Sequence, residues 1–442
     1  MFYLKIRFLK KLSVSWALLL FATLGFSQNN NIANQITNER SLQQGMEGLS
    51  LAELQGLLIQ NNPQLRSATG IASAAQFGVV PARTLDNPTV NISQTSIPKN
   101  PLALGSSAQM NWGLSQNLPW PGKKNLSGEI AQAQAYFTNE QVALLKVQLL
   151  GQLKTSWVSW QQANSQITIA RIQADRLEQI KEIVKLRYAN NAAAYVDFIN
   201  AQVTQAQIRS DIIGFERQAQ SLLAQISALI GHTSPQPLRL QLQSVVADKS
   251  SLDLKVLQQK ALEFNPALKA SQFTLDAAQR AVDLAELGKR PDFNLGLTSY
   301  SSSPPWGLGK TDVYGVSLGA SFPLYFAYKE RNLIDQAKAQ LLAARDADES
   351  LKQQVALQVE TAYLQWAQSI EQLKLIEERV VAQARIGYRL ALTNYSNNQA
   401  TYMDLLNAYN ALRASELTQE QSRSSAVLAK TALDVAVGTP QN

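Results

Sequence analysis

The residues that could carry chemistry are few in this chain of 442 residues. Cysteine is absent and His232 is the one histidine, which leaves almost no capacity for a metal site or a catalytic triad. His232 stands at an expected helix end, where a capping role is commoner than metal ligation, and Met110 and Met403 are too few for a soft-metal relay. No glycine-rich phosphate loop or paired-acid constellation stands out. The sequence therefore predicts a protein that is not an enzyme and has no cofactor and no resident metal.

Two short segments carry acidic residues at matching positions. The segments YVDFINA at 195–201 and YMDLLNA at 402–408 share a D-x-x-N-A pattern. Thr401 and Asp404 have the spacing of a capping box, and Asp197 falls in a first helical turn, where the helix dipole favours acids. These local roles are compatible with a second role for the same carboxylates. The residues that the pattern singles out are Asp197, Asn200, Asp404 and Asn407.

The N-terminal residues predict export. A basic leader and an apolar run from Val14 to Phe26 are typical of a cleaved secretory signal over 1–27, rather than of a membrane anchor. Without the four basic residues of the leader the formal net charge falls from +7 to about +3, which is too little to indicate nucleic-acid binding. Because cysteine is absent, a lipoprotein is not expected. Residues 28–48 are polar and rich in Asn and Gln, and we expect them to be irregular.

The chain contains the same pattern twice. Pro63 in LQGLLIQNNPQL matches Pro266 in LQQKALEFNPAL at a shift of 203 residues. Trp160 matches Trp366 at a shift of 206, and the two D-x-x-N-A segments match at 207. Ordered landmarks with small drifts indicate a tandem duplication.

Each copy predicts a helix of modest length, two strands, a very long helix and a shorter return helix. The helices are expected at 50–82, 124–190 and 195–230, and again at 252–288, 328–394 and 401–437. The strands are expected at 87–97 and 108–119, and again at 291–302 and 312–324. The chain is thus divided into a first repeat at 49–231 (strands about 87–119), a linker at 232–251, a second repeat at 252–438 (strands about 291–324) and a tail at 439–442.

The strand candidates alternate between apolar residues and small or polar ones. Along 314–322, Tyr, Val, Leu, Ala and Phe alternate with Gly and Ser, which suits a wall between lipid and a wet lumen. A half-buried sheet of a soluble protein has the same period. The export signal favours a sheet in the membrane, and so does the number of strands, which three copies of the chain could close into a barrel.

The long helices need neighbours along their whole length. No proline interrupts Leu126–Tyr188, and apolar residues recur there in steps of three and four. A helix of about 65 residues is a rod of roughly 100 Å. A free-standing coiled coil would also support such a helix, but the two copies that bracket strand pairs favour a tube of packed hairpins.

The number of strands predicts the number of subunits. Four strands cannot close a barrel, and open sheet edges are not tolerated in lipid. Two copies would give eight strands, whose interior is filled by side chains. Three copies give twelve strands around a wider bore. We therefore expect a homotrimer.

This duplicated order of elements resembles the TolC family of outer-membrane efflux factors from about Leu51 to Gly438, most specifically at the turns of Pro63 and Pro266. The resemblance implies a mostly α-helical trimer in which a 12-stranded outer-membrane barrel continues into a periplasmic α-helical barrel of a Gram-negative-type cell. It implies a passive channel, surrounded by outer-membrane lipid, that receives substrate from an inner-membrane pump (RND type favoured) and a periplasmic adaptor (membrane fusion) protein. The segment LPWPGKK at 118–124 is similar to the CusC/CzcC branch, which favours heavy-metal cations, although prolines that end a strand explain it as well.

The same resemblance implies a gate at the periplasmic tips. Asp404 and Asn407 would face the bore at its narrowest point, and Asp197 would lie on the neighbouring hairpin, where the family often holds a latch between hairpins. Tyr395 matches a latch tyrosine, but the position of the latch arginine is Ala400, so the usual latch is not expected. Aromatic residues near strand ends are candidates for a membrane-interface girdle or for ordinary packing: Trp112, Trp120, Tyr300, Trp306 and Tyr325.

Two other functions fit parts of the pattern. A channel for drugs or secreted proteins would have the same sequence features. A periplasmic adaptor is also exported and helix-rich, but it would carry one hairpin inside a soluble β domain rather than two hairpins flanked by strand pairs.

Overall fold

The computed structural model describes residues 48–95, 109–232, 238–243, 247, 252–302 and 311–439. The expected signal at 1–27, most of 28–48 and much of 232–251 lie outside these ranges. The chain divides into a small unit, Met1–Leu54 with Ser234–Gln243, and a large unit, Gln55–Thr233 with Ser244–Asn442. In the small unit, Leu49 forms a parallel bridge with Leu240.

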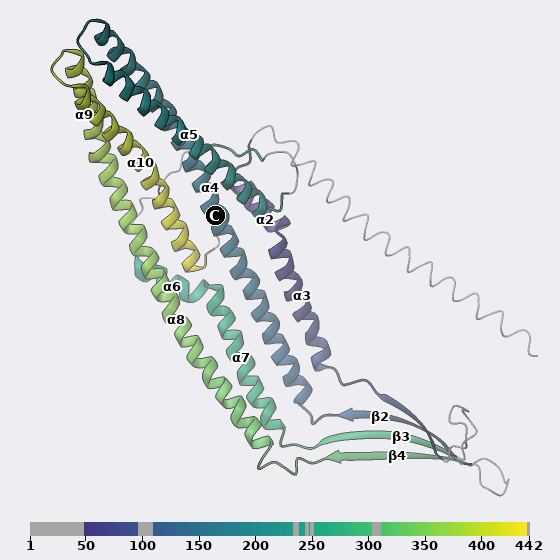
Figure 1. The fold of residues 1–442 in the computed structure, drawn as a ribbon. Coiled ribbons are helices and arrows are strands. Elements are labelled where there is room, and N and C mark those ends of the chain that lie inside the picture. The colour runs from purple at the N-terminus through teal and green to yellow at the C-terminus, as the bar shows by residue number, and fades with distance from the viewer. Residues whose placement is uncertain are drawn as a thin grey trace, which may run out of the picture. The chain divides into compact units, whose positions relative to one another are not determined.

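The elements follow one another in the same order in both halves of the chain (Figure 1). In the first half these are α2 (Leu51–Asn61), α3 (Pro63–Arg83), β1 (Thr89–Thr95), β2 (Gln109–Leu118), α4 (Lys123–Ala189) and α5 (Tyr195–Leu229). In the second half they are α6 (Leu254–Phe264), α7 (Pro266–Leu287), β3 (Asp292–Ser302), β4 (Thr311–Ser321), α8 (Glu330–Leu375), the π-helix η1 (Ile376–Val380), α9 (Val381–Ser396) and α10 (Tyr402–Val437).

Each helix of modest length is broken once, where one continuous helix was expected. The breaks fall at Asn62 and Asn265, which have extended backbone conformations and precede prolines. A proline disfavours the helical conformation of the residue before it, and it is well tolerated at the first position of the next helix. Both asparagines cap that next helix, because their side chains accept hydrogen bonds from Leu65 N (3.0 Å) and Ala267 N (2.9 Å).

The same two asparagines also hold the ends of the return helices. The Asn62 amide donates to the carbonyl of Leu229 (2.8 Å), and the Asn265 amide donates to that of Ala436 (3.0 Å). In the second half, the end of α10 can approach Asn265 closely because the residue that follows this helix is Gly438, with φ +81°. A Cβ at this position would lie 2.8 Å from Asn265 Cα. Each return helix is thereby fixed to the break in its own half of the chain.

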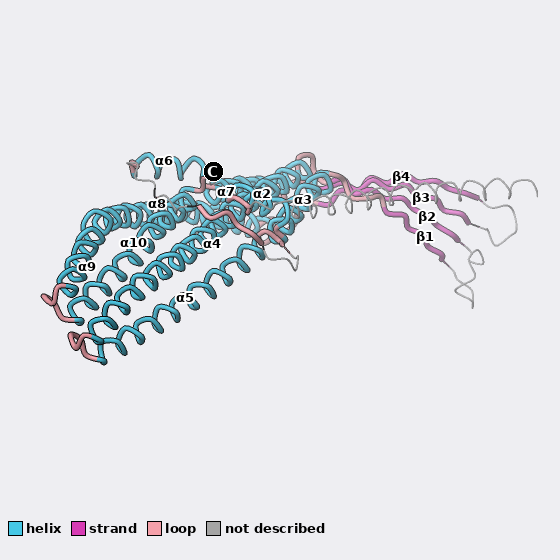
Figure 2. Tube along the Cα trace, turned by 90° about the horizontal axis from the view of Figure 1, so that it is seen from above, coloured by secondary structure: helices cyan, strands magenta, loops and turns pink. Residues whose placement is uncertain are grey.

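The two long helices differ in continuity. α4 runs for 67 residues without interruption, whereas the second long helix contains η1 between α8 and α9. Within the large unit, the strands extend from one end of the helices and the α4–α5 and α9–α10 turns lie at the other (Figures 1 and 2). The hairpin turns are therefore far from the sheet.

The four strands form one antiparallel sheet in the order β1-β2-β3-β4. Directly paired residues share a face, so the register divides the side chains into an apolar face and a polar face. The apolar face carries Val90, Ile92, Trp112, Leu114, Leu295, Leu297, Tyr314, Val316 and Leu318. The polar face carries Asn91, Ser93, Asn111, Asn117, Asn294 and Thr298. Within the described residues, the outer edges of β1 and β4 have no partner strand.

Strand β4 ends before the expected residue 324. It stops at Ser321, and residues 324–329 form turns that lead into α8. Pro323 cannot donate a hydrogen bond to a neighbouring strand, which explains the earlier end.

Candidate functional site at the hairpin turns

The two hairpin turns have matching backbone geometry. Asn191 and Asn398, which lie 207 positions apart, both adopt left-handed conformations, with φ of 55° and 61°. Ala192 N donates to Arg187 O, and Gln399 N donates to Asn394 O, each at 2.8 Å. Asparagine tolerates this conformation better than most residues. The turns thus place the starts of α5 and α10 equivalently.

Asp404 forms the expected capping box at the start of α10. Its carboxylate accepts hydrogen bonds from Thr401 N (2.9 Å) and Thr401 Oγ1 (2.7 Å), and Asp404 N donates to Thr401 Oγ1 (3.2 Å). These bonds favour the ionised form and lower the pKa of the Asp404 carboxyl from its ordinary value of 3.8. Asp404 and Asn407 are both exposed and lie one turn apart. The carboxylate is therefore a charged group at the surface of the tip.

Asp197 lies in the first turn of α5, among tyrosines from the other hairpin. It is half-buried, and its backbone N donates to Ala194 O (3.1 Å). Burial raises the pKa of the Tyr402 hydroxyl to about 12, with further contributions from Asp197 and Tyr395. Asn200 is also half-buried, and its carbonyl accepts a hydrogen bond from Thr204 Oγ1 (3.0 Å).

Tyr395 is held by an arginine that the sequence did not indicate. Its ring is 2% exposed, and the guanidinium carbon of Arg187 lies 4.1 Å from the ring centroid. Arg187 also donates to the carbonyls of Tyr395 and Ala192, and so it contacts both hairpins. The usual latch was not expected because of Ala400, but a different arginine, from the end of α4, contacts the tyrosine. Only its place in the last turn of α4 could have drawn attention to it.

An apolar core continues from the turns along the hairpins. It contains buried residues of α4, α5, α9 and α10, among them Val184, Ile208, Tyr395, Tyr402, Leu405 and Tyr409. The Tyr409 hydroxyl donates to Gln173 O (2.7 Å), and Arg176 is paired with the buried carboxylate of Glu416 (2.7 Å). The two hairpins of one chain are therefore packed together, rather than separate.

The interface aromatics do not share one surface. Trp112 and Tyr325 are exposed, and Trp120 is half-buried with its ring 6.0 Å from that of Phe293. Tyr300 pairs with Asn111 and so lies on the polar face of the sheet, opposite to Trp112. Tyr300 and Trp112 therefore point to opposite faces of the sheet, because side chains alternate between the two faces along a strand, and the girdle stays a prediction. Trp306 lies outside the described residues.

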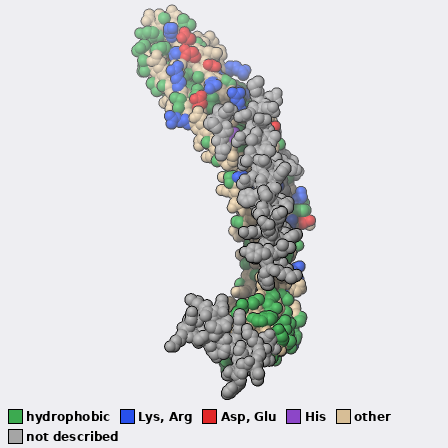
Figure 3. Space-filling model, turned by 90° about the vertical axis from the view of Figure 1, so that its right-hand side faces the viewer, with side chains coloured by type: hydrophobic (Ala, Val, Ile, Leu, Met, Phe, Trp, Pro, Cys, Tyr) green, Lys and Arg blue, Asp and Glu red, His purple; other side chains and the backbone are tan. Residues whose placement is uncertain are grey.

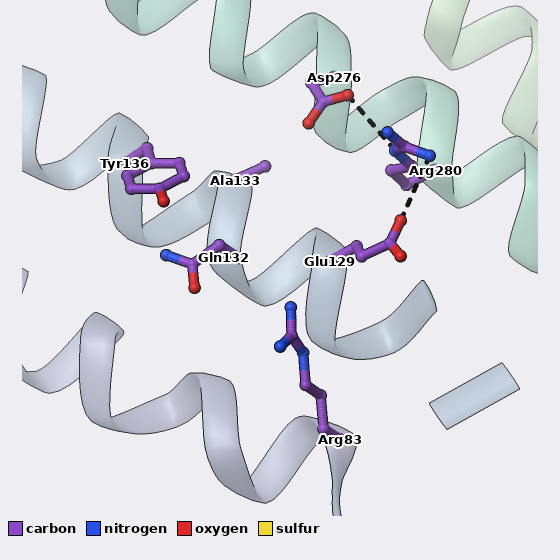
Figure 4. A pocket seen from close by; sticks show the side chains of 7 residues that line it. All are labelled: Arg83, Glu129, Gln132, Ala133, Tyr136, Asp276 and Arg280. Atoms are coloured by element: carbon purple, nitrogen blue, oxygen red, sulfur yellow. Dashed lines mark ion pairs between the residues drawn. The ribbon is translucent and has the colours of Figure 1, made fainter. Parts of the chain in front are cut away.

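A polar hollow of about 200 Å³ lies between α3, α4 and α7 (Figure 4). Arg280 joins α7 to α4 there through an ion pair with Glu129 (3.3 Å), and it also pairs with Asp276 of its own helix (3.4 Å). Across the residues described, no three His, Cys, Asp or Glu side chains come together in a way that could hold a metal ion. The lining residues are Arg83, Glu129, Gln132, Ala133, Tyr136, Asp276 and Arg280.

Among the described helices, none combines the length and the apolarity needed to cross a membrane.

Comparison with known proteins identifies the family. The profile of the family described as "Outer membrane efflux protein" matches this chain twice, at residues 54–232 and 257–439. The chain is 20% identical over 403 residues to outer membrane protein TolC of Vibrio cholerae serotype O1, covering 88% of this chain and 91% of that protein. It is 22% identical over 366 residues to the cobalt-zinc-cadmium resistance protein CzcC of Cupriavidus metallidurans, covering 82% and 84%. A solved structure of CusC superposes with a TM-score of 0.74 at 17% identity, covering 89% of this chain and 93% of that one. The predicted resemblance is confirmed, and the chain belongs to the outer membrane efflux protein family.

Proposed function

We propose that this protein is the outer-membrane channel of a tripartite efflux system, and that it conducts substrate passively from an inner-membrane pump and a periplasmic adaptor to the exterior. The observation that carries this proposal is the sheet. One of its faces is apolar, and the described strands leave the outer edges of β1 and β4 unpaired. In lipid such edges must be paired, and further copies of the chain can pair them. Three copies would contribute twelve strands, and the leader at 1–27 would direct the chain to the periplasm.

Heavy-metal cations are the substrate class we favour. Two observations support them: the LPWPGKK segment and the likeness to a cobalt-zinc-cadmium resistance protein. The likeness to TolC over 88% of the chain supports a second candidate, a channel for drugs or secreted proteins. Neither candidate requires chemistry by the channel itself.

The hairpin turns are the proposed gate. Asp404 and Asn407 would line the constriction, where three copies of the carboxylate around one axis would attract cations. Asp197, Asn200 and Tyr395 would lie behind it, at the contact between hairpins. The exposed position of Asp404 and the burial of Tyr395 support this division of roles.

A growth assay tests the substrate class. A strain that lacks this chain is grown with graded cobalt, zinc or cadmium salts and, separately, with hydrophobic drugs. We expect the deletion to lower the tolerated metal concentration and plasmid-borne protein to restore it, with little change for drugs. The opposite pattern would establish the drug channel, and a purified protein that forms no pore in lipid bilayers would refute both.

A further inference from the structure

The junction between β4 and α8 exposes an unusual run of large apolar side chains. Residues 322–331 read FPLYFAYKER. The exposed fractions of Phe322, Leu324, Tyr325 and Tyr328 lie between 65% and 86%. Contiguous exposed apolar side chains mark a surface that contacts a partner or a membrane. We call residues 322–331 together with Lys289 the second junction.

The second junction continues the apolar face of the sheet. Tyr314, Val316 and Leu318 on β4 are 73–76% exposed, and Phe322 follows them at the same two-residue spacing. Apolar side chains gather at the strand end of the large unit in Figure 3. Under the proposed function this face contacts acyl chains, and the junction lies where the face meets the periplasmic helices.

Cationic side chains border this apolar run. The Lys289 ammonium lies 5.6 Å from the centroid of the Phe326 ring, and Lys329 and Arg331 are exposed. In the part of the chain that the structure describes, none of these three cations has an acidic partner within 4.0 Å. Glu330 is the acid within the run, and the nearby Glu286 is paired with Lys338 at 4.0 Å. The second junction therefore has an excess of positive charge.

The matching junction of the first repeat provides an internal comparison. LPWPGKK at 118–124 also joins a strand to a long helix, but its cations are paired within the chain. Lys123 contacts Asp292 and Lys124 contacts Asp86, each at 2.8 Å. The open cations of the second junction are therefore not a general requirement for joining a strand to a helix in this fold.

We propose that the second junction binds acidic phospholipid of the leaflet that faces the periplasm. The phosphate would lie among Lys289, Lys329 and Arg331, while Tyr325 and Tyr328 would lie at the boundary between headgroups and acyl chains. Aromatic residues and basic side chains at the end of an apolar surface match both parts of such a lipid. A second copy of the chain would cover the apolar side chains but would leave the cations unexplained. This proposal rests on the proposed function, because it places β4 in the membrane.

Native mass spectrometry of the full-length protein in detergent tests the proposal. The protein is titrated with phosphatidylglycerol and, separately, with phosphatidylcholine. One basic residue near a membrane surface contributes about 1 kcal/mol to the binding of anionic lipid, which corresponds to a factor of about five in affinity. We expect K289Q/K329Q/R331Q to lose at least about tenfold in phosphatidylglycerol affinity and to bind phosphatidylcholine as before. The control K374Q/R345Q/R389Q removes the same charge from exposed sites on α8 and α9 and should change neither affinity.

Two results would overturn the proposal. Equal binding of both lipids by the unaltered protein would show that the cations do not select acidic headgroups. A triple variant that dissociates into single chains but retains its lipid preference would identify the junction as a contact between copies. Pore formation in bilayers without a preference for phosphatidylglycerol refutes this proposal alone, whereas failure to form a pore refutes the proposed function.

Discussion

Arg171 on α4 and Glu216 on α5 form an ion pair in the first hairpin, with 3.2 Å between a guanidinium nitrogen and a carboxylate oxygen. The positions 206 and 207 residues further along the chain are Glu377 and Arg423, and they pair at 2.8 Å in the second hairpin. The two pairs join the same places of the long and return helices with their charges exchanged. Each hairpin therefore has one acidic and one basic residue at these two positions, although the position that carries each charge differs between the hairpins.

The first hairpin should therefore tolerate an exchange of the charges at positions 171 and 216, whereas reversal of one charge alone should destabilise it. We expect R171E and E216R each to lower the stability of the hairpin, because each sets like charges against one another. The double variant R171E/E216R should recover the unaltered melting temperature. Since both side chains are about half exposed or more, the effect of each single variant should stay within about 1 kcal/mol. Melting followed by circular dichroism measures it, and a double variant as unstable as the sum of the singles would contradict the equivalence.

Arg187 should restrain the hairpin turns. R187A removes the contact with the Tyr395 ring and two hydrogen bonds to carbonyls of different hairpins, so we expect a larger single-channel conductance in planar bilayers. R187K keeps the charge but loses the planar guanidinium, and its conductance should lie between the two. The control R217A alters an exposed arginine of α5. If R187A and R217A conduct alike, Arg187 does not restrain the gate.

Asp404 should give the channel a preference for cations that persists at acidic pH. Thr401 lowers the pKa of this carboxyl below 3.8, so the charge is present above the lowered pKa and is lost only as the pH falls through it. We expect D404A to abolish most of the preference at neutral pH, and T401V to shift its loss to higher pH. Reversal potentials in a salt gradient measure both effects, with E349A as a control on the exposed surface of α8. Unchanged selectivity in D404A would exclude Asp404 from the constriction.

The contact between Gly438 and Asn265 should contribute strongly to stability. G438A forces a side chain into a left-handed conformation and against Asn265 Cα, and we expect a loss of about 1 kcal/mol or more. N265A removes a helix cap and a partly buried hydrogen bond to the end of α10, with an expected loss of about 1–3 kcal/mol. G387A provides the opposite control, because that helical glycine has open space around it and alanine should stabilise it. The melting temperature should fall for G438A and N265A and rise for G387A. An unchanged melting temperature of G438A would contradict the stabilising role of this glycine.

The π-helix η1 should be removable by deleting one residue. Asp404 lies 38 positions after Trp366, whereas Asp197 lies 37 after Trp160, so the second repeat has one extra residue in this interval. The extra residue coincides with η1, while α4 passes the matching place as an unbroken α-helix. Deletion of the exposed Glu378 should therefore restore a continuous helix and keep or raise the melting temperature by a few degrees. A deletion variant that fails to fold would show that the extra residue is required elsewhere.

Local signals in the sequence determined the order of the elements and much of their extent. The prolines after Asn62 and Asn265, the Thr401–Asp404 capping box and the two-residue alternation of β4 each depend on neighbours within a few positions. Such signals can be read without knowledge of the fold, because helix caps and strand periods are set by the nearby backbone. The repeated landmarks at shifts of 203 to 207 predicted that the two halves have the same order.

Only the tertiary structure decided which distant residues meet. The contact of Arg187 with Tyr395 joins residues 208 positions apart, and the placement of Tyr300 opposite Trp112 depends on the register between β2 and β3. Neither relationship produces a periodic pattern in the sequence. The sequence does not say which arginine reaches the Tyr395 ring, and a shift of β3 against β2 by one residue leaves the alternation along each strand unchanged. The packing of whole helices and the pairing of whole strands select one partner among these, and that selection sets the geometry of the hairpin turns.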